Sequence, residues 1–328
     1  MNTKVGVDGG KTKFDAAVMT SQGKYRTKVF DNNPAGFAAF AAWLDAYVPA
    51  GRSQAHVCME STGSYHEALA CFLFDAGIAV SVVNPLRVKR FMESEGVRNK
   101  TDRGDAKALA RFAQKNEPEC WEAPAPAVRT LQALVARLDA LMEMRQAERN
   151  RQEVSHPSVQ PSIEAMLGSI DEAIAEVRRQ IAATIDDDPD LKRRSELLET
   201  IPGLGDRTIP QLLAYIGRPQ RFKSVKALTA YACLSPLIRQ SGTSLDRHKG
   251  THPTGHHALR SALYFPAMVA GRHNPSVAAF WARLKAQHKP GKVIVVACMH
   301  KLLAIVYGVL KSGRPFDAQV ALGHGPHS

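Results

Sequence analysis

The spacing of apolar residues changes once along this chain, at Pro124-Ala-Pro126, and that change constrains the fold more than any other feature. Before it, apolar runs of strand length are separated by turn residues, at residues 4–7, 14–20, 25–30, 56–59 and 80–83. After it, apolar residues recur every three or four positions between charged ones, as in amphipathic helices. The sequence therefore predicts an α/β domain followed by a mostly helical remainder.

The first domain has an informative order of elements. Three short strands are followed by a helix that opens at Pro34, a strand, a helix over residues 65–76, and a last strand stopped by Asn84-Pro85. Proline favours the first turn of a helix, and Gly77 stands where a helix C-cap belongs. This order predicts a ribonuclease-H-like, or resolvase-like, α/β domain over residues 1–126.

Two long amphipathic stretches follow, over residues 128–151 and 162–185, with Pro157 and Pro161 between them. They predict an antiparallel coiled-coil hairpin over residues 127–190, and a two-helix portion of a bundle is the alternative. Residues 191–328 form a third predicted domain, which is mostly α-helical and rich in glycine, proline, histidine and basic residues.

Charge and cysteine content narrow the class of partner. The chain has 43 Lys and Arg against 31 Asp and Glu, a formal charge of +12, which favours nucleic acid over an anionic membrane. Its five cysteines show no CxxC spacing, so neither a disulfide framework nor a zinc knuckle is expected. The longest apolar stretch contains His300 and Lys301, which favours a buried helix over a membrane span. Without a signal-peptide pattern, we expect a cytoplasmic protein.

Four acids stand at positions that favour a catalytic site. Asp8 ends the first apolar strand, and Glu60 ends the fourth, just before Ser-Thr-Gly. The edge at which strands of an open α/β sheet end is where such domains place their sites. Asp102 and Asp105 follow in Lys-Thr-Asp-Arg-Gly-Asp, three residues apart, so that they face the same way on a helix.

Clustered carboxylates repel each other by about 1 kcal/mol per pair in water and about 4 kcal/mol at an effective dielectric of 20. Divalent cations relieve that repulsion, and two Mg²⁺ ions, or Mn²⁺ in their place, activate an attacking oxygen at a phosphodiester. Each acid alone has a structural explanation as a turn residue or helix cap, but all four together favour a metal site. The start Asp8-Gly-Gly-Lys-Thr also resembles the phosphate loop of sugar kinases and actin-like ATPases, yet no second phosphate loop follows.

A second candidate site is the basic segment that contains Ser241-Gly. The sequence predicts a turn-rich loop in which Arg239, Arg247 and Lys249 cradle a phosphate. Serine is a weak nucleophile unless a base, a metal or strong charge stabilisation assists it. Ser-Gly is also a common loop dipeptide, so from the residues alone an ordinary loop position is the simpler explanation of Ser241.

Other candidates near this segment have simpler explanations. Ser244 is equally eligible from the residues alone. Tyr231 and Tyr264, the alternatives for a tyrosine nucleophile, lie in apolar helical stretches and are expected in the core. Four histidines lack the cysteine or carboxylate that would complete a zinc site and are expected near phosphate, namely His248, His252, His256 and His257.

Further residues predict nucleic-acid contacts. Gly203 and Gly205 form a Pro-Gly-x-Gly turn before an apolar helix, as in helix-hairpin-helix motifs whose backbone N–H groups hold a phosphate. A plain turn between helices is the alternative. Arg260 lies on an amphipathic stretch and is expected to face nucleic acid, as are Lys100 and Arg103 beside the third acid.

In their order and spacing these motifs resemble the insertion-sequence-110 family of DEDD transposases. The likeness runs from Lys4 to Phe316 and covers nearly the whole chain. It consists of Gly-x-Asp8, Glu60-Ser-Thr-Gly, Asn-Lys-Thr-Asp102-x-x-Asp105, Ile201-Pro-Gly-x-Gly, Ser241-Gly, Leu259-Arg260 and Gly-Arg-Pro-Phe316. Each motif is short, so the specificity comes from their combination.

The resemblance implies a function that the residues alone do not give. It implies a resolvase-like domain in which Asp8, Glu60, Asp102 and Asp105 bind Mg²⁺, and a nucleophile, Ser241, that joins covalently to DNA. It also implies a structured non-coding bridge RNA that pairs with donor and target DNA. Such enzymes form homodimers that assemble into tetramers, to which the hairpin would contribute contacts, and they act in the prokaryotic cytoplasm at the nucleoid.

Three departures from the family pattern concern phosphate contacts. They are Gly9-Gly10 after the first acid, Thr254 where a lysine is common, and the additional acid Asp246. None of them removes a proposed catalytic group. The sequence leaves two alternatives, a metal-dependent junction-resolving nuclease without a covalent intermediate and a non-catalytic nucleic-acid-binding scaffold.

Overall fold

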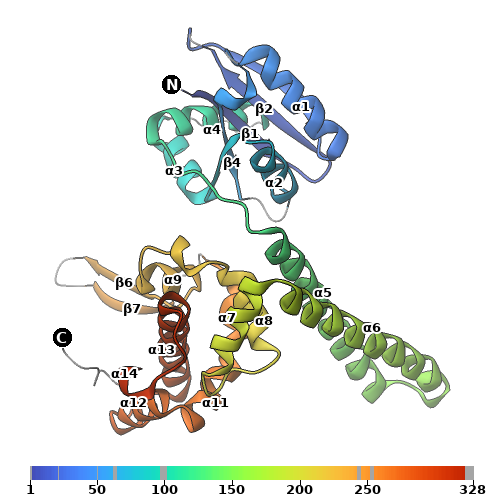
Figure 1. The fold of residues 1–328 in the computed structure, drawn as a ribbon, viewed down its shortest axis with the longest axis vertical. Helices are drawn as coiled ribbons and strands as arrows, with labels where there is room; N and C mark the ends of the chain where they lie inside the picture. Colours follow the sequence, from blue (N-terminus) through green and yellow to red (C-terminus); the bar gives the residue numbers. More distant parts are fainter. Residues whose placement is uncertain are drawn as a thin grey trace. The chain divides into compact units, whose positions relative to one another are not determined.

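The computed structural model describes residues 2–20, 22–49, 51–61, 65–96, 102–241, 245–251 and 255–321, without the side chains at 102–103, 236–241, 245–251 and 320–321. The chain divides into two compact units, Met1–Ala123 and Pro124–Ser328 (Figure 1). Each unit has hydrophobic clusters of its own. The further boundary expected near residue 190 stays a prediction.

The N-terminal unit is built on a five-stranded mixed sheet. Its strands are β1 (Thr3–Gly9), β2 (Lys13–Met19), β3 (Tyr25–Asp31), β4 (Ala55–Glu60) and β5 (Ala79–Val83). Their order in the sheet is β3-β2-β1-β4-β5, in which β1, β2 and β3 pair antiparallel and β4 and β5 extend the sheet in parallel. The α/β architecture predicted from the element order is confirmed.

Helices cover both faces of this sheet. On one face, α1 (Pro34–Tyr47) and α2 (Glu67–Asp75) enclose a core that includes the stacked rings of Phe14 and Phe30, 5.4 Å apart. On the other face, α4 (Asp102–Asn116) packs against the central strands, with α3 (Pro85–Ser94) beside it. The Asn33 side chain accepts a hydrogen bond from the N–H of Gly36 and caps α1 ahead of its Pro34.

The C-terminal unit begins with two long helices, α5 (Pro126–Val154) and α6 (Gln160–Asp187), which lie along each other (Figure 1). Buried residues recur along both of them, including Leu131, Val135 and Ile174. The helices occur where their apolar spacing predicted them, while the coiled-coil geometry itself stays a prediction.

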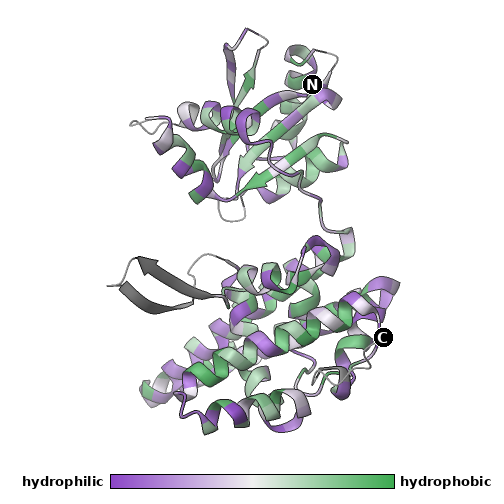
Figure 2. Ribbon diagram, turned by 90° about the vertical axis from the view of Figure 1, so that its left-hand side faces the viewer, coloured by the Kyte–Doolittle hydropathy of each residue, from purple (hydrophilic) through white to green (hydrophobic). Residues whose placement is uncertain are grey.

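The rest of this unit is mostly helical, as the sequence predicted. Its helices are α7 (Pro189–Glu199), α8 (Thr208–Ile216), α9 (Val225–Tyr231), α10 (His257–Ala262), α11 (Tyr264–His273), α12 (Pro275–Ala286), α13 (Gly291–Ser312) and α14 (Ala318–Ala321). Short 3-10 turns occur at Arg52–Gln54, Pro157–Val159 and Pro219–Arg221. Hydrophobic and hydrophilic residues alternate along the helices of both units, as expected of amphipathic helices packed on a core (Figure 2).

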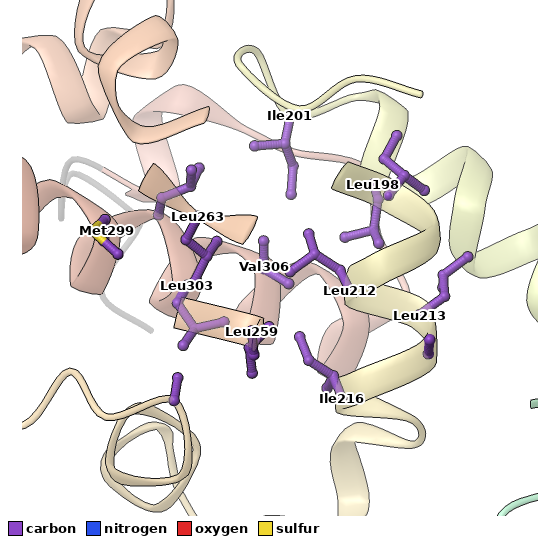
Figure 3. Close-up of a cluster of buried hydrophobic side chains, with 14 of the residues drawn as sticks. Leu198, Ile201, Leu212, Leu213, Ile216, Leu259, Leu263, Met299, Leu303 and Val306 are labelled. Carbon is purple, nitrogen blue, oxygen red and sulfur yellow. The ribbon is translucent and has the colours of Figure 1, made fainter. Parts of the chain in front are cut away.

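The helix α13 is the centre of the C-terminal core. By length and composition alone it could cross a membrane, and 61% of its most apolar window is buried inside the protein. Its Met299, Leu303 and Val306 point into a cluster shared with α8 and α10 (Figure 3). This helix therefore occupies the buried position that the sequence predicted for the longest apolar stretch.

The segment around Ser241 differs from its prediction. In place of a turn-rich loop, β6 (Pro236–Ser241) and β7 (Leu245–Thr251) pair antiparallel as a two-stranded sheet. Charged and polar residues dominate β7, and β6 begins with the short apolar run Pro-Leu-Ile before three polar residues. Without an alternation of apolar and polar residues, the sequence carried no strand signal there.

Candidate active site

The first two acids lie at the same end of two neighbouring parallel strands. β1 pairs with β4 in parallel, with Val7 opposite Met59, so that Asp8 and Glu60 are the next residues on each strand. Both acids are half-buried. The parallel register thus places them side by side at the carboxyl edge of the sheet, as the sequence predicted for strand ends.

The two acids also share a face of the sheet. Side chains alternate along a strand, so Asp8 lies on the same face as Gly6, and Glu60 lies on the same face as Cys58, the partner of Gly6. Cys58 packs in a cluster with Leu109 of α4. Asp8 and Glu60 therefore lie on the face that α4 covers.

A glycine on β1 allows α4 to lie directly on the sheet. A Cβ atom at Gly6 would overlap the backbone of Ala106 and Ala110, and it would lie 2.9 Å from the Cβ of Leu109. No larger residue fits between β1 and α4 at this point. The close approach fixes the height of α4 above the strand that ends in Asp8.

The third described acid belongs to the first turns of α4. Asp105 precedes Ala106, whose carbonyl lies against Gly6, and only 7% of Asp105 is exposed. Asp102 opens the same helix three residues earlier, and its side chain lies outside the described residues. The structure therefore brings Asp8, Glu60 and Asp105 to one face of the N-terminal unit.

The electrostatics of this face agree with the placement of Glu60. Burial and the nearby Glu60 carboxylate raise the pKa of Cys58 to about 12. The Cys58 thiol consequently stays protonated at neutral pH and is no candidate nucleophile. Among the described side chains, no group of three ligand-type residues already lies close enough to hold an ion.

Sequence reasoning missed one acid on the same face. Asp15 of β2 lies directly opposite Asp8 in the antiparallel register and is 6% exposed. Directly paired residues of antiparallel strands point to the same side of a sheet. A position inside a strand carries no sequence signal of a site, but the register places Asp15 beside Asp8.

The strands β6 and β7, which we call the serine hairpin, belong to the C-terminal unit. Ser241 is the last residue of β6 and pairs with Leu245, and Arg239 pairs with Arg247 directly across the hairpin. Like charges directly opposite each other destabilise a strand pair. An anion bound between them would remove that repulsion, so the register favours the predicted phosphate contact. The side chains of β6 and β7, Lys249 included, lie outside the described residues.

The base of the hairpin is fixed to the helical core. Gly255 has φ +152°, and a Cβ there would lie 2.6 Å from the carbonyl oxygen of Tyr231. The next residue, His256, donates its backbone N–H to the same carbonyl at 2.6 Å. The His256 ring lies 4.4 Å from the Tyr215 ring and 5.4 Å from the Tyr231 ring. The chain therefore re-enters the core at one defined place after β7.

His256 has a structural role in addition to any contact with phosphate. Its Nδ1 accepts a hydrogen bond from the N–H of Leu259 at 3.1 Å and caps α10. Burial and the Arg221 guanidinium lower the pKa of His256. Its ring is therefore a neutral N-cap near pH 7.

The glycine turn before α8 contains two glycines with different surroundings. Gly203 has φ +105°, and a Cβ there would lie 2.7 Å from the Cβ of Ala270 in α11. Nothing lies within 4 Å of the equivalent position at Gly205, whose carbonyl accepts hydrogen bonds from Thr208 and Ile209. Gly203 thus has a packing requirement, while Gly205 leaves room for a partner to approach; phosphate binding by either stays a prediction.

Arg260 lies close to the entry of the hairpin. The inner side of α10 is buried, with Leu259 pointing into the core (Figure 3). Burial raises the pKa of Cys233, and the Arg260 guanidinium opposes that rise. Since Cys233 stands three residues before β6, Arg260 lies near the base of the hairpin, and its contact with phosphate stays a prediction.

Two tyrosines expected in the core differ in their exposure. The ring of Tyr231 lies 5.3 Å from that of Phe222 and packs against the buried cluster. Tyr264, by contrast, is 39% exposed, so the prediction that it is a core residue is wrong. Its neighbours Leu263 and Pro266 occupy the buried side of the chain. Lys100 lies outside the described residues, as do the side chain of Arg103 and Ser244.

Comparisons with known proteins bear on both units. A family model described as "Transposase", of the IS110 DEDD type, matches residues 5–154. A second, described as "Transposase IS116/IS110/IS902 family", matches residues 195–282. The first range includes all four acids, and the second includes Gly203, Ser241 and Arg260.

Individual relatives extend over most of the chain. It is 35% identical over 320 residues to a pilin gene-inverting protein from Moraxella lacunata, covering 97% of this chain and 98% of the relative. It is 23% identical over 290 residues to the transposase for insertion sequence element IS1111A from Coxiella burnetii, covering 77% of each. The RuvC structure from Thermus thermophilus aligns with a TM-score of 0.28 and 17% identity, over 36% of this chain and 99% of that one.

The family that the sequence motifs resembled is thus confirmed by matches over both units and by a relative of nearly equal length. That family comprises transposases and related recombinases, whose substrate is DNA. The chain belongs to the IS110 family of transposases and is a DNA-recombining enzyme.

Proposed function

We propose that this transposase cuts and rejoins the DNA of a mobile element in an RNA-guided, Mg²⁺-dependent reaction with Ser241 as the covalent nucleophile. The observation that carries the proposal is that Asp8 and Glu60 end β1 and β4 on the face of the sheet that α4 covers, while Asp105 lies in the first turns of α4. A basic hairpin that ends in a serine supplies the second component.

The acid set fits a hard divalent cation. Its donors are carboxylate oxygens alone, which Mg²⁺ and Mn²⁺ prefer over nitrogen or sulfur ligands. Asp8, Glu60, Asp102 and Asp105 would hold one or two ions, and we expect the DNA phosphate to complete the coordination. When bound, the metal supplies positive charge that offsets the carboxylates and the developing charge on the phosphate.

The proposed covalent step balances without a co-reactant. Ser241 Oγ attacks the phosphorus of a DNA phosphodiester, one P–O bond forms as another breaks, and the serine proton passes to the departing deoxyribose hydroxyl. The number of phosphoester bonds is unchanged, so the step reverses when another DNA hydroxyl attacks the serine–phosphate bond. Arg239 and Arg247, which face each other in register, hold the phosphate during the exchange.

Guide RNA and subunit assembly belong to the same proposal. A net charge of +12 supports binding of both DNA and a structured non-coding RNA that pairs with donor and target. Met144 of α5 and Met166 of α6 are 48% and 51% exposed. These exposed apolar side chains support contact between the α5–α6 helix pairs of two subunits, in a homodimer that pairs into a tetramer. The enzyme then acts in the cytoplasm at the nucleoid.

The Moraxella relative favours inversion as a second outcome of the same chemistry. Its printed name concerns the inversion of a pilin gene, and it is 35% identical to this chain over nearly its full length. Cleavage and rejoining at two sites on one DNA molecule gives inversion, whereas exchange between two molecules gives insertion. A plasmid with two candidate sites in opposite orientation distinguishes them by its restriction pattern.

The test is a denaturing gel of purified protein with labelled element-end DNA, target DNA, the flanking non-coding RNA and Mg²⁺. We expect a covalent protein–DNA band that Ser241→Ala removes and that Ser244→Ala leaves in place. Asp105→Asn should reduce cleavage at least about a thousandfold, because it removes metal-directed stabilisation of the transition state, about 1.4 kcal/mol for each factor of ten. Glu93→Gln, an exposed acid of α3, is the matched control.

Each contrary result selects an alternative. Cleavage with free ends and no covalent band supports a metal-dependent, junction-resolving nuclease. Binding that survives Asp105→Asn without any cleavage by the parent protein supports a non-catalytic scaffold. A covalent band without RNA would contradict the guide while leaving the serine mechanism intact.

A further inference from the structure

A long stretch of the C-terminal unit has no acidic residue. Between Arg247 and Phe316 the sequence contains eleven lysines and arginines and no aspartate or glutamate. The stretch includes α10, α11, α12 and α13, together with residues 247–251 of β7, which directly follow Asp246. The side chains that this stretch contributes to the surface are therefore neutral or positive, which favours a polyanion as partner.

Two aromatic side chains stand exposed within this stretch. Phe265 is 73% exposed and Tyr264 is 39% exposed, and their rings meet edge to face with centroids 5.5 Å apart. Val269, one helical turn further along α11, is 46% exposed. We call Tyr264, Phe265 and Val269 the aromatic platform. Water is a poor solvent for such a group of side chains, so its exposure indicates a binding surface.

The platform is held rigidly, because the residues on either side of it are buried. Leu263 points into the core cluster (Figure 3), and Pro266 and Ala267 are buried as well. On the next turn, Ala270 packs against the backbone of Gly203. The helix α11 therefore cannot rotate to bury Phe265 without breaking these contacts, and a preorganised ring binds a flat partner with little loss of entropy.

Cations flank the platform. Arg272, in the last turn of α11, is exposed, and Arg260 of α10 lies near the entry of the serine hairpin. A second copy of this chain would bring an equally acid-free surface against it, and like charges oppose such a contact. An unpaired nucleotide offers both chemistries in one molecule, a flat ring face for Phe265 and a phosphate that attracts the arginines.

We propose that the aromatic platform binds unpaired bases of the DNA strand that lies at the serine hairpin. This inference rests on the proposed DNA strand exchange, in which bases beside the cleaved phosphate leave one partner strand before they pair with another. In duplex DNA the base faces are already stacked. An exposed aromatic side chain stabilises the separated state by replacing that stacking.

The test compares two DNA probes of equal length and composition, a fully paired duplex and a duplex with a short central bubble of mismatches. A 2-aminopurine in the bubble reports base stacking by its fluorescence, and anisotropy of an end label gives the dissociation constant at fixed salt. We expect the parent protein to prefer the bubble and to quench 2-aminopurine. Phe265→Ala should weaken bubble binding about tenfold, the usual effect of losing one aromatic–base stack, and leave duplex binding unchanged.

Two further variants separate stacking from simple apolar contact. Phe265→Leu keeps apolar area but loses the ring, so it should behave like Phe265→Ala. Tyr47→Ala removes a 46% exposed tyrosine from the N-terminal unit and is the matched control. The large exposure of Phe265 makes unfolding of these variants unexpected, and circular dichroism verifies their folding.

Three outcomes would overturn the inference. They are equal binding of bubble and duplex by the parent protein, full retention of bubble binding by Phe265→Ala, and a change in sedimentation without a change in DNA affinity. The last would assign the platform to a second copy of the chain. A protein that binds bubble DNA through Phe265 but never cleaves DNA would refute the proposed function and leave this inference standing, so the two failures are distinguishable.

Discussion

In the N-terminal unit, the acids stand on adjoining elements whose positions are set by sheet register and by the contact of α4 with Gly6. In the C-terminal unit, Ser241 stands at the end of a two-stranded hairpin that belongs to no larger sheet among the described residues. An isolated two-stranded hairpin is marginally stable in water. The positions of Asp8, Glu60 and Asp105, which together we call the acid face, are thus set by the fold itself. By contrast, we expect Ser241 to reach its final position only when phosphate is bound at the serine hairpin.

The largest effect is expected at Gly6, where α4 can pack on β1 only because glycine has no side chain. Gly6→Ala places a Cβ into the backbone of α4, where no side chain can move aside. We expect the N-terminal unit to lose about 3 kcal/mol of unfolding free energy or more, together with metal-dependent cleavage. Urea denaturation followed by fluorescence measures the first effect.

The same strand provides the control for this substitution. Nothing lies within 4 Å of a Cβ at Gly9, and its backbone lies outside the left-handed region. Gly9→Ala should therefore leave stability unchanged. Equal stability of both variants would show that α4 does not rest on Gly6, and the argument that joins Asp8 to Asp105 would fail with it.

The sequence could predict most of the acid face because its signals are regular. Apolar runs of strand length that end in an acid located Asp8 and Glu60, and the three-residue spacing predicts that Asp102 and Asp105 face the same way. The role of Gly6 depends on the approach of a helix about a hundred residues away, which no local pattern reports. Asp15 was missed because its partner strand and register are tertiary facts.

The C-terminal unit was less predictable for a related reason. Amphipathic spacing located α5 and α6, because burial of one helix face leaves a period in the sequence. The strands of the serine hairpin carry no regular alternation of apolar and polar residues, so no such period marks them. Tyr264 was placed in the core from its apolar neighbours, yet at a helix start adjacent residues point in different directions, and only the packing of Leu263 and Pro266 shows which side is buried.

A second pair of glycines extends the comparison to the C-terminal unit. Gly203→Ala would combine a left-handed backbone with overlap against Ala270, so we expect a loss of about 2–3 kcal/mol in unfolding free energy. Gly205→Ala meets no atom within 4 Å and should leave stability unchanged. If the turn holds a phosphate, Gly205→Ala weakens DNA binding instead. Thermal denaturation and DNA titration together separate the packing role from the binding role.

A smaller effect is expected from the opposed arginines of the hairpin. Arg239→Gln removes one cation from a like-charged cross-strand pair, so it relieves repulsion in the free protein and weakens phosphate binding. We expect DNA affinity to fall severalfold and the dependence of log K on log salt to become shallower by about one phosphate contact. Arg179→Gln, an exposed arginine of α6, is the control. An unchanged salt dependence would argue against a phosphate between Arg239 and Arg247.

The smallest predicted effect concerns pH and a buried histidine at the edge of the sheet opposite the acids. Lys4 Nζ donates to His56 Nδ1 at 3.0 Å, and Ser81 Oγ, 2.7 Å from His56 Nε2, donates to the carbonyl of Glu119 at 2.9 Å. Since the ammonium group can only donate and the serine proton is used, His56 is neutral with its proton on Nε2. Burial and Lys4 lower its pKa from the ordinary value of 6.5.

The sign of the pH dependence follows from that lowered pKa. As pH falls through 6.5, the unfolded chain takes up a proton at His56 before the folded chain does, so folding stability decreases until the folded group also titrates. The contribution of His56 is complete above pH 6.5 and is lost in the acid range. We expect the N-terminal unit to melt at a lower temperature at pH 5.5 than at pH 7.5, and His56→Gln to reduce that difference.

The control is His288→Gln, which changes an exposed histidine of the other unit. If His56→Gln keeps the full pH difference, the network of Lys4, His56 and Ser81 does not contribute the pH dependence.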